Sequence, residues 1–183
     1  MIKNNNFIIN IETKTKKWLD FKPTKYKHLE SFFKNKINLL SHYTDLKKFL
    51  KNQNNQAEIS IFLVSNLQIR RINQEFRNID KPTNVLTFGY LDEQVIRDSN
   101  LNAILKKSKY HFLGDIFFAF EKIKSEAIKE NKSFENHLTH LILHSILHII
   151  GFDHQDEQEA EIMESIEIKI LKSLNIKNPY QQN

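Results

Sequence analysis

The sequence predicts an α/β (α+β) fold in which a small mixed β-sheet is packed with helices. Up to residue 120, short apolar segments rich in β-branched residues alternate with segments of helical periodicity, which is typical of a sheet covered by helices. From residue 121 onward, the apolar residues follow helical periodicity alone. The chain has 183 residues, 40% of them hydrophobic, which is enough for one core. We therefore expect a single domain over residues 1–183.

The N-terminal half predicts two strands and two helices. Residues 7–11 (FIINI) have the composition of a strand, and residues 24–40 have one apolar helical face. A polar loop is expected at 51–56, followed by a buried strand at 57–64 (AEISIFLV) because its apolar run is nearly continuous. Ser65 and the Gln three residues later have the spacing of a capping box, which predicts a helix through about Phe76.

Pro82 ends this helical pattern, and a second set of elements follows it. Two further strands are expected, at 84–90 (NVLTFGY) and 113–120 (LGDIFFAF), with an irregular loop at 91–111 between them. Three helices are expected after them: 121–130, 133–150, and one from Asp156 or Glu157 to about Leu174. The helix at 133–150 is apolar nearly all round, so we expect it to be buried at the centre of the fold.

The composition excludes several kinds of protein. The chain has no cysteine, so disulfides and thiolate metal sites are excluded, and a metal would need His or carboxylate ligands. The N-terminal residues lack the apolar segment of a signal peptide, and no apolar run approaches the ~20 residues that span a bilayer. We therefore expect a soluble cytoplasmic protein with no membrane partner.

Charge is distributed unevenly along the chain. Residues 1–50 carry 11 basic and 4 acidic side chains, residues 51–110 carry 9 and 6, and residues 111–183 carry 7 and 12. Basic surface beside a cationic site favours a polyanionic partner such as nucleic acid. A lysine-rich composition also gives a solvated basic surface with no such partner, so both interpretations stay open.

Residues 144–154 (HSILHIIGFDH) place three of the eight histidines in an apolar stretch. His144 and His148 are one helical turn apart, so both project from one helix face and can share a metal ion. Gly151 suits the left-handed conformation that reverses a chain at a helix end, which would bring His154 back toward the pair. We expect these three histidines to bind one zinc ion at the C-terminal end of the buried helix, in a zincin-like arrangement.

Three imidazoles and one water form the open tetrahedral site of a catalytic zinc ion. Such an ion lowers the pKa of its bound water toward ~7 and supplies hydroxide at neutral pH. His140 lies on the same helix face, but two turns (~12 Å) separate it from His148, too far for both to bind one ion. His140 is therefore expected to support the site without ligating the metal.

The spacing H-x-x-x-H-x-x-G-x-x-H also occurs in metzincin proteases, where a general-base Glu directly follows the first His. In this chain Ser145 occupies that position. Without the carboxylate, the group that takes a proton from the attacking water is missing. A metzincin-like metalloprotease lacking the usual Glu is kept as an alternative.

Three ordered blocks of the sequence resemble the YbeY family, bacterial endoribonucleases involved in rRNA maturation. HSILHIIGFDH is similar to the family pattern H-G-x-L-H-L-x-G-Y-D-H, with Ser145 in place of Gly and Phe152 in place of Tyr. NQEFRNIDKPTNVLTF (73–88) is similar to N-x-x-[FY]-R-x-x-D-x-P-T-D-V-L-S-F, and LGDI (113–116) resembles a third block. The resemblance covers about residues 57–170.

The resemblance implies a zinc-dependent, single-strand-specific endoribonuclease that acts in 16S rRNA 3′ end processing and ribosome quality control. The implied partners are single-stranded RNA and the small ribosomal subunit, with no readout of a DNA sequence. It implies His144, His148 and His154 as zinc ligands, with His144 also in a catalytic role. Arg77 would be a catalytic or phosphate-contacting residue, and Lys81 a further substrate contact. Without the resemblance, Arg77 is more simply a surface residue at a helix C-terminus.

Two aspartates are candidates for supporting the site. Asp153 lies between the turn glycine and the third ligand, where it either orients a histidine or caps the next turn. Asp115, within a strand, either faces the pocket or pairs with a basic neighbour. Neither is an obvious general base. The non-catalytic alternative is a ribosome-associated protein in which zinc only stabilises the fold.

Overall fold

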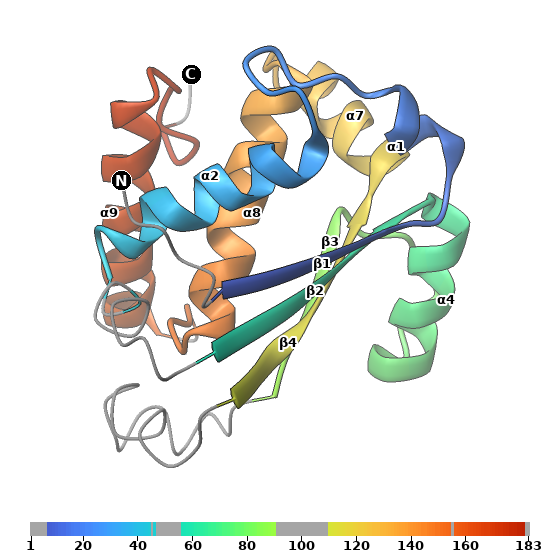
Figure 1. Ribbon diagram of the computed structural model, residues 1–183, viewed down its shortest axis with the longest axis horizontal. Helices are drawn as coiled ribbons and strands as arrows, with labels where there is room; N and C mark the ends of the chain where they lie inside the picture. The colour runs from blue at the N-terminus through green and yellow to red at the C-terminus, as the bar shows by residue number, and fades with distance from the viewer. Residues whose placement is uncertain (1–6, 45, 47–55, 91–109, 155, 182–183) are drawn as a thin grey trace.

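Four strands form one mixed sheet in the order β1-β2-β4-β3 (Figure 1). The computed structural model describes residues 7–44, 46, 56–90, 110–154 and 156–181. The strands are β1 (Phe7–Thr13), β2 (Gln56–Val64), β3 (Val85–Gly89) and β4 (Tyr110–Ala119). β2 pairs in parallel with both β1 and β4, and β3 pairs antiparallel to β4. The predicted α/β class with a small mixed sheet is confirmed.

Six helices accompany the sheet in the part of the chain that the structure describes. They are α1 (Lys16–Asp20), α2 (Leu29–Ser41), α4 (Asn66–Arg77), α7 (Phe120–Lys129), α8 (Phe134–Ile149) and α9 (Glu157–Ser173). The capping box at the start of α4 is confirmed, because the side chain of each partner bonds the backbone N–H of the other. None of these helices has both the length and the apolar character needed to cross a membrane.

One helix was not predicted, and two elements start three residues or more from their predicted positions. Helix α1 was not predicted, and α2 begins at Leu29 instead of residue 24. The Tyr26 N–H donates to the Pro23 carbonyl in a turn before α2, and the amide and hydroxyl of Thr24 both donate to the Glu135 carboxylate of α8. Strand β4 begins at Tyr110 instead of residue 113, since its pairing with β2 starts there. Most of the loop predicted at 91–111, and most of the one at 51–56, lie outside the described residues.

The two faces of the sheet are covered differently. Along β2, Ile59 and Ile61 point into the main core with α2 and α8, whereas Phe62 and Val64 pack with α4 in a smaller cluster. Figure 1 shows α4 on one side of the sheet and α2, α8 and α9 on the other. Helix α8 buries side chains all round, as its pattern predicted. It is thereby held rigidly by its neighbours on several sides.

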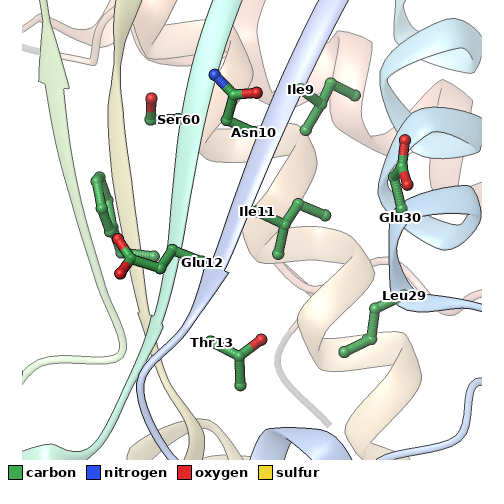
Figure 2. Close-up of a pocket in the computed structure, with 9 residues that line it drawn as sticks. Ile9, Asn10, Ile11, Glu12, Thr13, Leu29, Glu30 and Ser60 are labelled. Carbon is green, nitrogen blue, oxygen red and sulfur yellow. The ribbon is translucent and has the colours of Figure 1, made fainter.

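An open pocket of about 470 Å³ lies where the edge strand β1 faces α2 (Figure 2). Figure 2 shows Ile9 and Ile11 on the side of the pocket toward α2 and Asn10 beside Ser60 of β2. Its charged lining residues, Glu12 and Glu30, are both acidic. An acidic lining repels polyanions, so this pocket does not suit the nucleic-acid partner that the charge pattern favours.

Candidate metal centre

Helix α8 ends in a turn that reverses the chain at Gly151. Gly151 has a φ of 94°, which disfavours residues with a Cβ. Its N–H donates to the His148 carbonyl at 3.0 Å, and the Phe152 N–H donates to the Leu147 carbonyl at 3.0 Å. These two bonds are the Schellman pattern of a helix C-terminus. The turn returns the chain toward the helix end and positions the residues that follow it.

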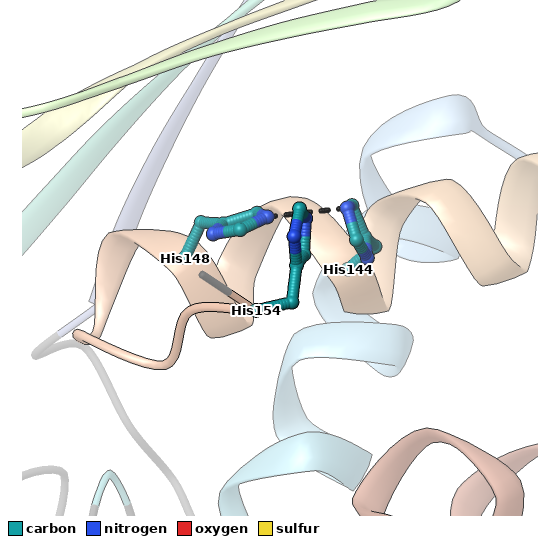
Figure 3. Close-up of side chains that lie close together, drawn as sticks. All are labelled: His144, His148 and His154. Atoms are coloured by element: carbon teal, nitrogen blue, oxygen red, sulfur yellow. Dashed lines mark hydrogen bonds between the residues drawn. The ribbon is translucent and has the colours of Figure 1, made fainter. Parts of the chain in front are cut away.

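The three histidines of the predicted motif lie together at this helix end (Figure 3). His144 and His148 project from one face of α8, and His154 reaches the same space from the returning segment. Each histidine offers one ring nitrogen, and these three nitrogen atoms all lie within 4.8 Å of one another. The Nε2 atoms of His144 and His148 are 3.1 Å apart.

The spacing of these nitrogen atoms suits a tetrahedral metal ion. Two nitrogen ligands, each ~2.05 Å from a tetrahedral ion, are separated by ~3.3 Å, close to the observed distance between His144 and His148. His154 is exposed, whereas His144 and His148 are half-buried, so the cluster opens toward solvent on one side. An open side leaves room for a water or a substrate oxygen.

The protonation state of His148 also favours metal binding. Burial lowers the pKa of His148, and the neighbouring His144 and His154 lower it further, to about 4. At neutral pH the ring is therefore uncharged and carries a lone pair that a metal ion can accept. A proton competes for this nitrogen only in acid.

A buried carboxylate, Glu167 of α9, lies directly behind the cluster. Its side chain is fully buried, and Oε1 lies 3.1 Å from Nδ1 of His144. Burial alone raises the pKa of Glu167, but hydrogen bonds from His140 and His144 outweigh this effect, so the pKa is lowered to about 2. Glu167 is ionised at neutral pH and accepts a hydrogen bond from a protonated ring nitrogen of His144.

Sequence reasoning assigned no role to Glu167, although one signal was available. Helix α9 buries Met163, Ile170 and Leu171 along one stripe, and Glu167 occupies a position within that stripe. A carboxylate at such a position is unfavourable unless it is hydrogen-bonded.

Tyr180 closes the other side of Glu167. Its hydroxyl donates to Oε2 of Glu167, and its ring packs edge-on against His140 with 5.7 Å between ring centroids. Burial raises the pKa of Tyr180, and the hydrogen bond to Glu167 raises it further, so the hydroxyl keeps its proton. The segment after α9 thus packs against Glu167 and His140, which the sequence pattern did not indicate.

The predicted supporting residues are placed in different ways. His140 Nε2 lies 3.5 Å from Oε2 of Glu167, so His140 contacts the same carboxylate as His144. Oδ1 of Asp153 accepts from the backbone N–H of His154 at 2.9 Å and lies 3.6 Å from Nδ1 of His148. Asp115 alternates with Ile116 on β4, and Ile116 points into the core with α8. Asp115 therefore points to the opposite face of the sheet, away from the histidines.

Arg77 and Lys81 lie on the α4 side of the sheet. Arg77 is the last residue of α4, and both side chains are exposed. Within the described ranges, no hydrogen bond, ion pair or ring contact joins either residue to the histidines. The structure therefore groups the three predicted ligands but does not group the predicted phosphate contacts with them.

The side chain at position 145 faces the core. Ser145 is fully buried, and its hydroxyl donates to the Leu141 carbonyl one turn earlier at 2.8 Å. A carboxylate that took a proton from an attacking water would need to reach the open side of the cluster. Ser145 has no carboxylate, and its side chain points into the core instead of toward the open side of the cluster. Both facts weigh against the protease alternative.

A second pocket, of about 610 Å³, is lined in part by His140, one helical turn before His144 on α8. Three lysines line it, from α7 and the turn after it: Lys122, Lys129 and Lys132. Two acidic residues, Glu126 and Glu130, pair with two of these lysines, at 3.4 Å and 2.7 Å. The remaining positive charge suits phosphate groups better than the acidic pocket beside β1 does.

Comparison with known proteins identifies relatives of this chain. A family model described as Endoribonuclease YbeY matches residues 11–175. Endoribonuclease YbeY of Francisella tularensis subsp. novicida (strain U112) is 42% identical over 130 residues, which cover 71% of this chain and 75% of that protein. The protein of the same name from F. tularensis subsp. tularensis (strain FSC 198) is also 42% identical, over 71% of this chain and 73% of its own length.

A solved structure shares the fold. The solution structure of TM1509 from Thermotoga maritima matches with a TM-score of 0.51 and 21% sequence identity, over 96% of this chain and 100% of that one. The match between the family model and residues 11–175, together with relatives at 42% identity, shows that the chain belongs to the endoribonuclease YbeY family.

Proposed function

We propose that this chain, acting as one domain over residues 1–183, is a zinc-dependent endoribonuclease that cleaves single-stranded RNA. The observation that carries the proposal is the convergence of three imidazoles at the end of α8 in a member of an endoribonuclease family. The resemblance of the histidine motif supports the finer proposal that the substrate is the 3′ end of 16S rRNA. The small ribosomal subunit would then be the partner, in rRNA maturation and ribosome quality control in the cytoplasm.

Zinc is the ion that the ligand set favours. The chain has no cysteine, so the candidate site is made of imidazole nitrogens, and catalytic zinc sites keep a fourth position open beside three such ligands. His144 and His148 would hold the ion from the rigid α8, and His154 from the returning segment. When bound, zinc would act as a Lewis acid on a phosphoryl oxygen and supply hydroxide near neutral pH.

Arg77 and Lys81 are proposed to bind the phosphate backbone. Cleavage of a phosphodiester builds negative charge on the phosphoryl oxygens, and a guanidinium is a planar, bidentate partner for them. Phe76, directly before Arg77, is 63% exposed and offers a ring on which a base can stack.

The edge strand β3 gives a path between the two groups of residues. Both α4 and α8 contact β3, which forms one edge of the sheet. An RNA strand bound along this edge would meet Arg77 on one side and approach the histidines on the other. This path supports the proposal because single-stranded RNA is long enough to contact both groups at once.

The test uses purified protein loaded with zinc and offered three substrates: single-stranded RNA, duplex RNA and casein. We expect cleavage of single-stranded RNA alone, and loss of cleavage in His148→Ala and after chelation. Arg77→Ala should lower kcat by at least tenfold, because one charge-assisted contact to the transition state is lost.

Two exposed residues provide matched controls for these variants. His28→Ala removes an exposed histidine at the start of α2, and Arg71→Ala removes an exposed arginine from α4. Neither should change the rate. Cleavage that persists in His148→Ala and in chelator would refute the metal mechanism. A zinc effect on melting temperature with no cleavage of RNA would favour the non-catalytic alternative, and cleavage of casein alone would favour the protease.

A further inference from the structure

The position of Glu167 poses a physical question about the metal centre. Glu167 is fully buried in the apolar stripe of α9, where Leu or Ile would fill the same space without a charge. Removing a carboxylate from water is costly unless hydrogen bonds replace its hydration. An apolar residue would fill this part of the core without that cost, so the carboxylate of Glu167 calls for an explanation other than packing.

Both carboxylate oxygens of Glu167 are in fact hydrogen-bonded. Oε1 accepts from His144 Nδ1 at 3.1 Å, and Oε2 accepts from the hydroxyl of Tyr180. His140 Nε2 lies 3.4 Å from the same hydroxyl, so His140 and Tyr180 together enclose Oε2. The hydrogen-bonding groups around Glu167 therefore come from α8 and from the segment after α9.

The bond to His144 determines which ring nitrogen is free. An ionised carboxylate only accepts hydrogen bonds, so the Nδ1 atom of His144 carries the proton. Nε2 is then unprotonated, and this is the atom that lies 3.1 Å from Nε2 of His148 in the cluster. The ring is held with its lone pair directed at the place where the three histidines converge (Figure 3).

We propose that Glu167 is a positioning residue that fixes the tautomer and orientation of His144 for metal binding, and that Tyr180 holds Glu167 in place. The inference rests on the proposed function in one respect, that a metal binds the three histidines. It goes beyond that function because it assigns roles to α9 and to the C-terminal segment, which contribute none of the three proposed ligands.

The first measurement is zinc affinity, by competition with a chromophoric chelator, together with the melting temperature of the metal-free protein. In Glu167→Leu, which suits the apolar stripe, we expect zinc affinity to fall ~10- to 100-fold. The metal-free melting temperature should also fall, because Nδ1 of His144 and the hydroxyl of Tyr180 both lose their acceptor. Tyr180→Phe, which removes one hydrogen bond from Oε2, should lower affinity by a smaller factor.

Glu161→Gln is the matched control, because Glu161 is an exposed carboxylate on the same helix. It should leave both quantities unchanged. A purely structural role for Glu167 predicts a lower melting temperature with unchanged zinc affinity, so zinc affinity is the measurement that separates the two roles. Glu167→Leu with wild-type affinity would overturn the proposal.

The second measurement does not depend on any variant folding. The ¹⁵N resonances of His144 in metal-free wild-type protein, recorded above pH 8, report which nitrogen carries the proton. We expect the Nδ1–H tautomer, and finding the Nε2–H tautomer would overturn the proposal. Zinc binding without RNA cleavage would refute the proposed function and leave this inference standing, so the two failures are distinguishable.

Discussion

Acid should lower the free energy of unfolding of the metal-free protein because His148 becomes protonated. Replacing His148 by Gln should remove this part of the acid effect. The folded-state pKa of His148 is lowered from its ordinary value of 6.5 to about 4. Between about pH 4 and pH 6.5, His148 binds a proton in the unfolded chain but not in the folded protein. Stability contributed by the neutral ring is therefore complete above pH 6.5 and is lost as the pH falls toward 4.

The size of the effect follows from this difference. Each tenfold change in proton affinity corresponds to ~1.36 kcal/mol, so the full window is worth roughly 3 kcal/mol and the change from pH 7 to pH 5 about 2 kcal/mol. The side chain is 24% exposed, so water screens part of this energy. We expect roughly 1 to 1.5 kcal/mol after that reduction.

Unfolding by urea in the presence of EDTA, near pH 7 and near pH 5, measures the effect. The higher of these values avoids the titration of His148, and the lower avoids that of Glu167. The folded-state pKa of Glu167 is lowered from 4.5 to about 2, so the stability that the ionised Glu167 gives the protein is lost chiefly below pH 4.5. Wild-type protein should lose more stability than His148→Gln by the amount given above, and His28→Gln should behave as wild type. Equal losses in wild type and His148→Gln would refute the reasoning.

Three further predictions concern single positions. Gly114→Ala should lower the free energy of unfolding by at least ~3 kcal/mol in thermal or chemical denaturation, because Gly114 has a φ of 154° and a Cβ would lie 2.2 Å from the Phe88 carbonyl oxygen. Gly89→Ala, with open space around the added atom, should cost little, and equal losses in the two variants would contradict this. Trp18→Phe should cost ~2 to 4 kcal/mol in the same assay, since it leaves a cavity and removes the hydrogen bond from Nε1 to the Val64 carbonyl; a change below ~1 kcal/mol would count against that bond. Ser145→Ala should keep wild-type kcat in the RNA cleavage assay, because this buried hydroxyl bonds only the helix backbone, and a large loss of kcat would give Ser145 a part in the chemistry.

The elements that local interactions determine were predicted well. The i, i+4 pair His144 and His148 and the reversal at Gly151 depend on backbone geometry within eleven residues, and the structure has both features. The capping box that begins α4 is equally local and was also predicted. The grouping of His154 with the pair follows from these short-range features.

Features that depend on distant contacts were missed. The segment before α2 is held by bonds from Thr24 to Glu135, which is 111 residues away. The five-residue helix α1 has little helical stability of its own, and its Trp18 is anchored by the hydrogen bond to β2. Periodicity within a segment carries no information about such partners.

The sequence by itself determined which residues can bind a metal, because their spacing along one helix and one turn is a local property. Only the tertiary structure decided what surrounds them: Glu167 and Tyr180 behind His144, and Arg77 and Asp115 on the other side of the sheet. Those relations come from the packing of α8 against α9 and against the sheet. Packing depends on how whole faces of separate elements fit together, so it is not encoded in the spacing of any one segment.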